Sequence, residues 1–454
     1  MTNFNIYSSK FGQSTDDLPE GEVNLYLTNE RIQAVIDSNT YNVEPRISIE
    51  PTLSTQFGKS NTRYNGEEWI TEPVTNTYTV TGASTATYVD ATGKIRTATV
   101  NKPRYTFDPA TGESLGLLIE EQRTNLLTWS EELDNAVWGK ANLTVTANTT
   151  VAPDGTTTAD SVFSNLATSS EHRVRAFLSM AVNTTYTASI FVKKITTRYA
   201  YIRDLTNDAF SVYDLYTGLV SRQAPGTVAS MEAIGGYYRI KMTFTTPSSI
   251  VNNLIDFGCT TRVDTFVSIV PIGEGVALWG AQLEAGTTPS SYTPTQASTF
   301  IPDSVIRFLG NEFNPNESSF YIEYTPNKLT GVGAILGTNS DNTNLIFHGD
   351  DSEGFGIDTR TVSGGVLTYS SPLITRLDAP SFKILSVLEQ GRQKLFINGD
   401  KVVDAPNTVT SYETISQIRI LRRTNGVIET GICKDFRYYP KALSESECLA
   451  LTKL

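Results

Sequence analysis

The sequence contains few of the residues on which many metal sites and disulfide frameworks depend. Its 454 residues include two histidines, His172 and His348, and three cysteines, Cys259, Cys433 and Cys448, with no C-x-x-C pair. An odd number of widely spaced cysteines supports neither a disulfide framework nor a cysteine-rich zinc site. We therefore expect three buried thiols.

Catalytic motifs are also missing. The sequence has no H-E-x-x-H, G-x-S-x-G or G-x-x-x-x-G-K-[ST] pattern, and no repeat of about 20 to 25 residues that would indicate a β-helix. Glycosidases need two carboxyl groups about 5 to 9.5 Å apart, but adjacent residues of a strand point to opposite faces. The adjacent carboxylate pairs here are Glu120-Glu121, Glu131-Glu132 and Asp350-Asp351. We predict that the protein is not an enzyme.

Basic residues are in the minority, and long apolar runs do not occur. The 36 Lys and Arg residues face 48 Asp and Glu residues, which gives a formal net charge of -12. Such a balance argues against binding to nucleic acid, which depends on cations that neutralise phosphates. No apolar h-region begins the sequence and no run reaches the length of a membrane span. We expect a protein made in a cytoplasm, with no membrane insertion.

The residues that are present favour β-strands. The chain has 32 Gly and 19 Pro and is rich in Thr, Ser and Asn, which favours strands joined by tight turns. Apolar residues alternate along several segments, and this period of two indicates half-buried strands. The alternating sets are Tyr186, Ala188, Ile190 and Val192; Tyr238, Ile240, Met242 and Phe244; and Phe320, Ile322 and Tyr324.

Local signals mark a hairpin and two short helices. Asn398-Gly399 lies between two strand-like arms and predicts a type I′ turn. Ser444 and Glu447 form a capping box that predicts a short C-terminal helix. Thr28 can cap a helix over 29–38.

That first helix is too short to be stable alone, so its apolar stripe must be buried elsewhere. Self-association and docking into a larger assembly would both bury it, and packing on its own chain is the alternative. The residues that we expect in such a contact are Leu25, Tyr26, Ile32, Val35 and Ile36.

The pattern predicts a mainly β protein with four parts. Residues 1–40 are an N-terminal segment with a short helix, and 41–125 a β-rich connector. Residues 126–297 and 298–454 are two antiparallel β-sandwiches, the second with the C-terminal helix.

Several segments resemble proteins of bacterial viruses. NLYLTNERIQAVI at 24–36 resembles adaptor segments near the start of phage tail-fibre proteins. Residues 83–138 are similar to a linker that recurs in phage structural proteins, where a carbohydrate-binding-like jelly roll follows it, and the segments APDGTTTADSV, YYRIKMTF and LWGAQLEAGTTPSSYTPT look like landmarks of that jelly roll. LFINGDKVVD and FRYYPKALSESE resemble the concanavalin-type lectin or laminin-G fold. On these landmarks, Trp129, Trp138 and Trp279 are expected in the core.

The resemblance implies a tail fibre of the virion that attaches it to host cell-surface glycan. Its expected partners are two further copies of the chain in a homotrimer, phage tail or baseplate proteins at the N-terminus, and host surface polysaccharide. A structural tail or baseplate fibre that binds virion proteins alone is the first alternative. A polysaccharide depolymerase is the second.

Glycan contacts combine aromatic faces with polar groups that hold hydroxyls. In the first sandwich the candidates are His172, Arg173, Arg175, Tyr199, Tyr201 and Arg203. In the second they are His348, Asp350, Tyr369, Arg376, Tyr412 and Arg422. The second sandwich is the more distal, and its loops at 338–356 and 360–376 are expected to be exposed and to carry host recognition.

No cofactor is expected, with Ca²⁺ as the open question. Hard oxygen ligands gather in 338–356, at Asp341, Asn342, Asn344, Asp350, Asp351 and Glu353. Their spacing matches no defined calcium loop, and turns rich in Asp and Asn look the same.

Overall fold

A computed structural model describes most of the chain after residue 50. The residues outside its description are 1–50, 52, 58, 65–68, 72–77, 82–85, 122, 296–303, 310–312, 328–332, 338–343, 352–353, 359, 364–365, 371–373, 376–380, 407–416 and 422–429.

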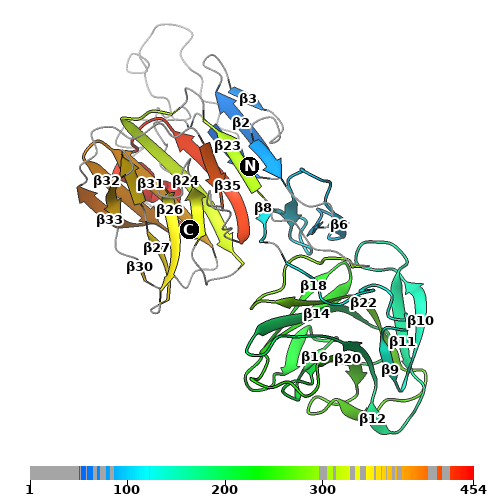
Figure 1. The fold of residues 1–454 in the computed structure, drawn as a ribbon. Helices are drawn as coiled ribbons and strands as arrows, with labels where there is room; N and C mark the ends of the chain where they lie inside the picture. Colours follow the sequence, from blue (N-terminus) through cyan, green and yellow to red (C-terminus); the bar gives the residue numbers. More distant parts are fainter. Residues whose placement is uncertain are drawn as a thin grey trace, which may run out of the picture. The chain divides into compact units, whose positions relative to one another are not determined.

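The first sandwich consists of two antiparallel sheets, each with six described strands (Figure 1). Sheet 1 has the order β10 (Leu143–Thr150), β11 (Ala159–Ser164), β22 (Gly275–Ala285), β14 (Thr185–Lys194), β19 (Tyr237–Thr245) and β18 (Val228–Ile234). Sheet 2 has the order β17 (Leu219–Arg222), β16 (Ala209–Asp214), β15 (Tyr199–Asp204), β20 (Leu254–Thr260), β13 (Arg173–Phe177) and β9 (Gly139–Ala141). A small ribbon pairs β12 (Ser169–Glu171) with β21 (Val267–Ile269).

The core of this sandwich confirms the alternation seen in the sequence. Ile190 and Ile240 of sheet 1 belong to one fully buried cluster with Ile202 and Phe257 of sheet 2. Trp138 belongs to the same cluster. Because every second residue of each strand enters this layer, the residues between them form the two outward faces on which the polar groups lie.

Two of the three expected core tryptophans are buried, and one expectation was wrong. Trp138 and Trp279 are 3% and 1% exposed. Trp129 is half-buried and has a φ of 54° in an irregular segment, where its carbonyl oxygen accepts a hydrogen bond from Trp138 Nε1 at 3.1 Å. Its backbone thus supports the core tryptophan, while its own side chain stays partly at the surface.

The second sandwich also consists of two antiparallel sheets. Sheet 3 has the order β3 (Trp69–Thr71), β2 (Ser60–Tyr64), β1 (Leu53–Gln56), β35 (Gly431–Tyr439), β24 (Glu317–Pro326), β31 (Phe382–Glu389), β32 (Arg392–Ile397) and β33 (Asp400–Pro406), with β8 (Ser114–Ile119) paired to β35 and β7 (Tyr105–Phe107) paired to β8. Sheet 4 has the order β30 (Ile374–Thr375), β27 (Gly354–Asp358), β26 (Asn344–Asp351), β25 (Gly333–Gly337), β34 (Gln417–Ile420), β23 (Ser304–Phe308) and β4 (Tyr78–Thr81). A ribbon pairs β28 (Arg360–Ser363) with β29 (Val366–Ser370).

Local signals in this sandwich are confirmed. Asn398 and Gly399 have φ values of 50° and 89° between β32 and β33, as a type I′ turn requires. Helix α3 (Glu445–Thr452) begins with the capping box, in which Glu447 N donates to Ser444 Oγ and Ser444 N donates to Glu447 Oε2. All three cysteines are free and buried.

The strands of residues 53–119 contribute to several sheets. Strands β1 and β8 both pair with β35, so they extend sheet 3. The hairpin of β5 (Thr87–Val89) and β6 (Ile95–Thr97) packs on the first sandwich instead. There, Ile95 N donates to Pro153 O at 3.1 Å and Thr87 Oγ1 donates to Tyr292 O at 2.6 Å.

The predicted fold class is confirmed. The described chain is mainly β, its sheets are antiparallel, and they form two sandwiches together with a short helix. The predicted N-terminal helix lies outside the described residues.

Candidate functional site

Some of the predicted site residues lie outside the described part of the chain. These are the N-terminal residues Leu25, Tyr26, Ile32, Val35 and Ile36, together with Arg376, Tyr412 and Arg422 of the second sandwich. Their roles in docking and in glycan binding stay predictions. The calcium hypothesis stays one as well, because Asp341, Asn342 and Glu353 are also outside the description.

The remaining residues of the second sandwich lie on strands, so the expectation of exposed loops was wrong for them. His348 and Asp350 lie on β26, opposite Ile357 and Phe355 of β27, and Tyr369 lies on β29. The Asp and Gly residues of 344–358 suggested turns, but apolar residues between them supply strand propensity, and the ladder pairs the backbone. Binding of glycan by these residues stays a prediction.

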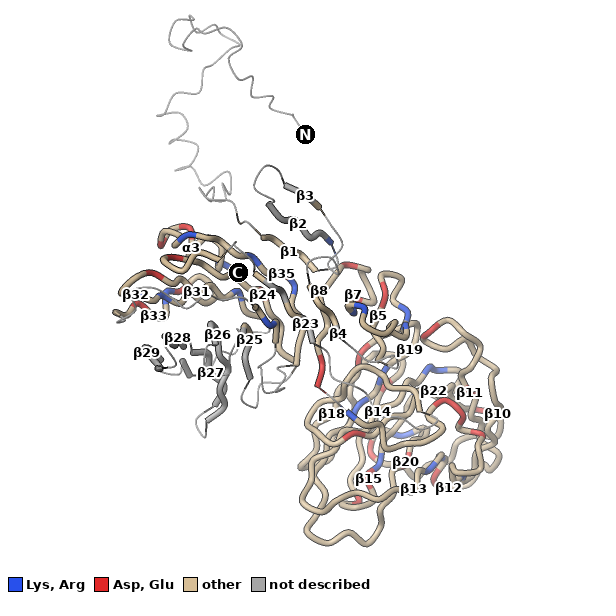
Figure 2. The backbone as a smooth tube through the Cα atoms, turned by 45° about the horizontal axis from the view of Figure 1, so that its top comes forward, with Lys and Arg blue, Asp and Glu red and all other residues tan. Residues whose placement is uncertain are grey.

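In the first sandwich, the structure brings the predicted arginines together on the outward face of sheet 2. Arg173 and Arg175 alternate on β13, while Tyr201 and Arg203 alternate on β15. Strand β20 lies between them and places Asp256 in register with both Arg175 and Arg203. Figure 2 shows basic and acidic segments next to each other on these strands.

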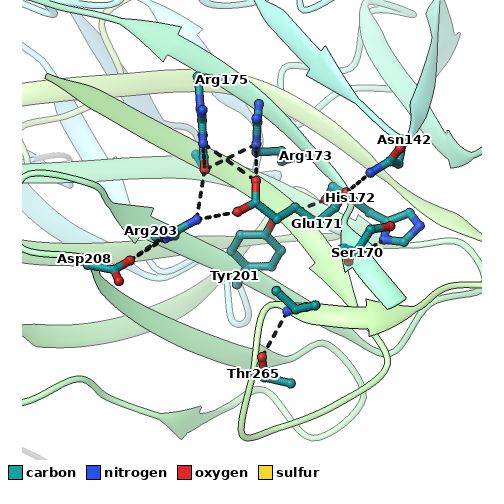
Figure 3. Close-up of polar contacts among 12 residues, drawn as sticks. Asn142, Ser170, Glu171, His172, Arg173, Arg175, Tyr201, Arg203, Asp208 and Thr265 are labelled. Carbon is teal, nitrogen blue, oxygen red and sulfur yellow. Dashed lines mark hydrogen bonds and ion pairs between the residues drawn. The ribbon is translucent and has the colours of Figure 1, made fainter. Parts of the chain in front are cut away.

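These arginines form an ion-pair network with their own carboxylates (Figure 3). Arg175 holds Asp256 with two hydrogen bonds of 2.6 and 2.7 Å. Arg173 Nε and Arg203 Nη1 each donate to Glu171 at 2.7 Å. Burial works to raise the pKa of Glu171, but the two arginines outweigh it and lower that pKa. The network therefore binds β12, β13, β15 and β20 to one another.

Of the other three members of the predicted cluster, Tyr199 is half-buried with the Arg198 guanidinium over its ring, and His172 and Tyr201 are covered. Each ring nitrogen of His172 lies within hydrogen-bonding distance of a backbone carbonyl oxygen, at Leu166 and Ser170. Tyr201 is fully buried and lies across Gly258, its cross-strand neighbour, where an added Cβ would be 2.6 Å from the ring. His172 and Tyr201 therefore serve the packing of this face and offer no surface to a ligand.

The outward face of sheet 1 carries a different set of side chains, arranged in cross-strand rows. In one row Phe191, Arg239 and Glu232 follow one another across β14, β19 and β18. In the next row Ser189, Lys241 and Ser230 do the same. Aromatic, cationic, acidic and hydroxyl groups thus alternate over one small area.

This face forms the floor of a cavity of about 420 Å³. Almost all of its lining comes from the first sandwich and from residues 87–120. The hairpin of β5 and β6 supplies one wall, and the segment 287–292 after β22 supplies another. The volume falls in the range of about 300 to 1,000 Å³ that is usual for small-molecule sites.

Aromatic rings support this cavity at one end. Phe191 and Tyr292 line it, and both pack against Trp279, with ring centroids 5.5 and 4.6 Å away. Tyr292 is held further by Ser130, whose hydroxyl lies 2.9 Å from its own. Both rings are buried, so they support the cavity from beneath its surface.

Of the two basic residues on the floor of the cavity, Lys241 forms an ion pair, and Arg239 forms no close one among the described residues. Lys241 Nζ lies 2.7 Å from Glu232 Oε1. Burial lowers the pKa of Lys241, and Glu232 acts in the opposite direction. Arg239 is 6% exposed; its Nη2 donates to Ser189 Oγ at 3.2 Å, and its Nε has no hydrogen-bond partner among the described residues.

The signal for this site in the sequence is weak. Arg239, Lys241 and Thr243 alternate with core residues along β19, which is also the pattern of a strand with one face in water. What turns the face into a cavity is its cover, which comes from residues far away in the chain. A single sequence does not reveal such contacts.

Within the described residues, no group of three or more His, Cys, Asp or Glu side chains is arranged to hold a metal ion. None of the helices in that part of the chain is both long and apolar enough to cross a membrane.

Comparisons with known proteins find similar structures but no relative in sequence. No protein-family model and no curated protein matches the chain. The carbohydrate-binding module CBM40 of the Ruminococcus gnavus IT-sialidase, bound to α2,3-sialyllactose, is 16% identical over 31% of this chain and 85% of its own, with a TM-score of 0.25.

Two further similar structures are a bacterial and an animal domain. Domain 4 of the Geobacillus stearothermophilus arabinanase AbnA, in complex with arabinotriose, is 14% identical over 34% of this chain and 73% of its own, with a TM-score of 0.27. Domains LG4-5 of the mouse laminin α1 chain are 10% identical over 59% and 88%, with a TM-score of 0.22. The class that the fold defines is that of antiparallel β-sandwich proteins.

Proposed function

We propose that this protein is an attachment protein that binds a glycan in the cavity of its first sandwich. The observation that carries the proposal is the cavity itself, with a volume of about 420 Å³ and a lining that combines the half-buried rings of Tyr88 and Phe107 with hydroxyl and charged groups. Sugars present an apolar ring face and many hydroxyls, so a site for them combines both kinds of group.

In this proposal the protein binds without catalysis. The two carboxylates that line the cavity are both engaged as acceptors: Glu232 by Lys241, and Glu120 by Arg104 and the backbone N of Ser291. Carboxylates held in this way stabilise the walls of a site. A glycosidase would instead need a pair directed at the scissile bond.

The biological setting that we propose is a trimeric tail fibre of a bacterial virus. The support is the resemblance of 24–36 to phage tail-fibre proteins and of 83–138 to a linker of phage structural proteins, together with the sandwiches that follow. Three linked copies would convert weak single contacts into firm attachment, because later contacts form at a high effective concentration.

Glycan binding can be tested on the full chain with a panel of immobilised bacterial surface polysaccharides. Ser230 is exposed and lines the cavity on the edge strand β18, so Ser230→Trp would fill the space without disturbing the core. We expect binding to at least one polysaccharide and an affinity at least tenfold lower in this variant.

The matched control is Ser221→Trp, an equally exposed serine on the edge strand β17 of sheet 2. It should bind as the unmodified chain does. If no polysaccharide is retained, or if Ser230→Trp binds as well as its control, the proposal is wrong.

The fibre assignment has its own test. The mass of the full chain in solution should be that of a trimer, and virus particles whose fibre lacks residues 1–40 should carry none of it. A monomer at micromolar concentration, or particles with a full complement of truncated fibre, would contradict the assignment.

A further inference from the structure

Arg239 is a buried cation that forms no close ion pair with a carboxylate among the described residues. The residue is 6% exposed and lines the cavity, and its guanidinium donates a hydrogen bond to the neutral hydroxyl of Ser189. Its Nε has no partner among the described residues. Buried charges in proteins are normally paired, because removing a charge from water is strongly unfavourable.

The nearest carboxylates are engaged elsewhere. Glu232 lies directly opposite Arg239 in the ladder, yet its carboxylate bonds to Lys241 in the next row. Glu284 is fully buried and accepts hydrogen bonds from the backbone N and hydroxyl of Ser290, at 2.8 and 2.6 Å. Both carboxylates attract the Arg239 guanidinium electrostatically, but their ion pair and hydrogen bonds are made with Lys241 and Ser290, so Arg239 keeps donors for a ligand.

The surroundings favour a singly charged, planar anion. A guanidinium matches the two oxygens of a carboxylate in a bidentate arrangement. A doubly charged phosphate would need a second free cation, and Lys241 is already neutralised by Glu232. The half-buried rings of Tyr88 and Phe107, together with the serine and threonine side chains of the lining, suit the ring and hydroxyls of a sugar.

We propose that the cavity recognises a carboxylate-bearing sugar, with Arg239 binding the carboxylate. This inference rests on the proposed function, because it names the class of glycan that the same site takes. It predicts a discrimination between sugars that differ in the carboxylate alone.

The experiment measures binding of three small glycosides to the full chain by calorimetry: methyl glucuronide, 3′-sialyllactose and methyl glucoside. The first two carry a carboxylate on different sugars. The third is the neutral counterpart of the first, with a hydroxymethyl group in place of the carboxylate. We expect at least one acidic probe to bind at least tenfold more tightly than methyl glucoside. The same preference for both acidic probes would point to the carboxylate alone, and a preference for one would identify the sugar.

The decisive variant is Arg239→Met, which keeps the length and removes the charge. We expect at least a tenfold loss of affinity for the acidic probe and a melting temperature that is unchanged or higher, because an unpaired buried charge is removed. A purely structural arginine would give the opposite result in the melting experiment. Arg222→Gln is the control: Arg222 lies over the Phe210 ring on sheet 2, away from the cavity floor, and should leave binding unchanged.

The outcomes separate this inference from the proposed function. If methyl glucoside binds as tightly as both acidic probes, or if Arg239→Met keeps the acidic preference, the inference is wrong. Polysaccharide binding that Ser230→Trp abolishes would still support the proposed function in that case. If no glycan of any kind binds, both are wrong.

Discussion

The two outward faces of the first sandwich use arginine in opposite ways. On sheet 2, the three arginines Arg173, Arg175 and Arg203 are neutralised by three carboxylates, those of Glu171, Asp256 and Asp208. On sheet 1, Arg239 is more deeply buried and lacks such a partner among the described residues. The first arrangement holds strands together, and the second leaves binding capacity for a ligand. The comparison shows that a cluster of cations in a sequence says little until the carboxylates around it are known.

Register explains the difference. On sheet 2, β20 lies between the arginine strands and brings Asp256 level with both of them. On sheet 1, Glu232 is level with Arg239 but bonds diagonally to Lys241. Diagonal partners are within reach of long side chains. Because Glu232 bonds to Lys241 and Glu284 accepts from Ser290, Arg239 is left without a close ion pair among the described residues.

The largest loss of stability is expected when the ion-pair network on the outward face of sheet 2 is broken. Asp256 is fully buried, and Asp256→Ala leaves Arg175 without its bidentate partner beside two further arginines. Removing one member of a buried ion pair typically lowers the free energy of unfolding by about 3 to 5 kcal/mol. Urea denaturation should show this loss, whereas Arg239→Met should show none. Similar losses in both variants would remove the distinction between the faces.

A smaller effect is expected where Tyr201 lies on the backbone of β20. In Gly258→Ala the new Cβ would be 2.3 Å from His172 O and 2.6 Å from Tyr201 Cζ, so the ring must move. Overpacking of this kind lowers the free energy of unfolding by about 1 to 3 kcal/mol. The melting temperature should fall, while sugar binding in the cavity on the other face is kept. An unchanged melting temperature would contradict the tight packing of this face.

The smallest effect concerns the hairpin that forms a wall of the cavity. Asp90 accepts hydrogen bonds from Thr92 N, Lys94 N and Arg96 Nε at 2.8, 3.1 and 2.6 Å. Burial works to raise its pKa, but these bonds outweigh it and lower the pKa from 3.8 to about 2.

A carboxyl group whose pKa is lowered in the folded state stabilises the fold at pH values above its pKa in the unfolded chain. This stabilisation is lost as the pH falls through the pKa of the folded state. At pH 6 the free energy of unfolding of Asp90→Asn should therefore be lower than that of the unmodified chain, by under about 1 kcal/mol. The difference is small because the ion pair of Asp90 with Arg96 is solvent-accessible. The difference should vanish as the pH falls from about 4 to about 2. Melting curves over this range check it, and a difference that persists at the lowest pH would contradict the role of the charge.

The sequence predicted the fold better than the site, for a physical reason. Core strands alternate with period two, so Ile190, Ile240 and Phe320 could be assigned to the interior from local pattern. The Asn398-Gly399 turn and the Ser444 capping box are local as well. Each of these features depends on neighbours within a few residues.

The candidate site depends on contacts that are not local. The cavity exists because residues 87–97 and 287–292 cover the face of β14, β18 and β19. Arg239 alone would be taken for an exposed strand residue. In the same way, the acidic and glycine-rich stretch around His348 and Asp350 was expected to form loops. Its residue composition does not show that it pairs with β27 as a strand.

The pairing of β35 has a consequence for how the chain is made. Strand β1 is synthesised early, yet its partner in the ladder lies almost at the other end, as the pair Leu53 and Tyr438 shows. The strands of the first sandwich all lie between Gly139 and Ala285, so this unit can fold on the ribosome while β1 still has an unpaired edge. Unpaired edges recruit other chains. During translation, the waiting strands β1 and β8 are therefore the segments that a chaperone would be expected to shield, until β35 leaves the ribosome and closes sheet 3.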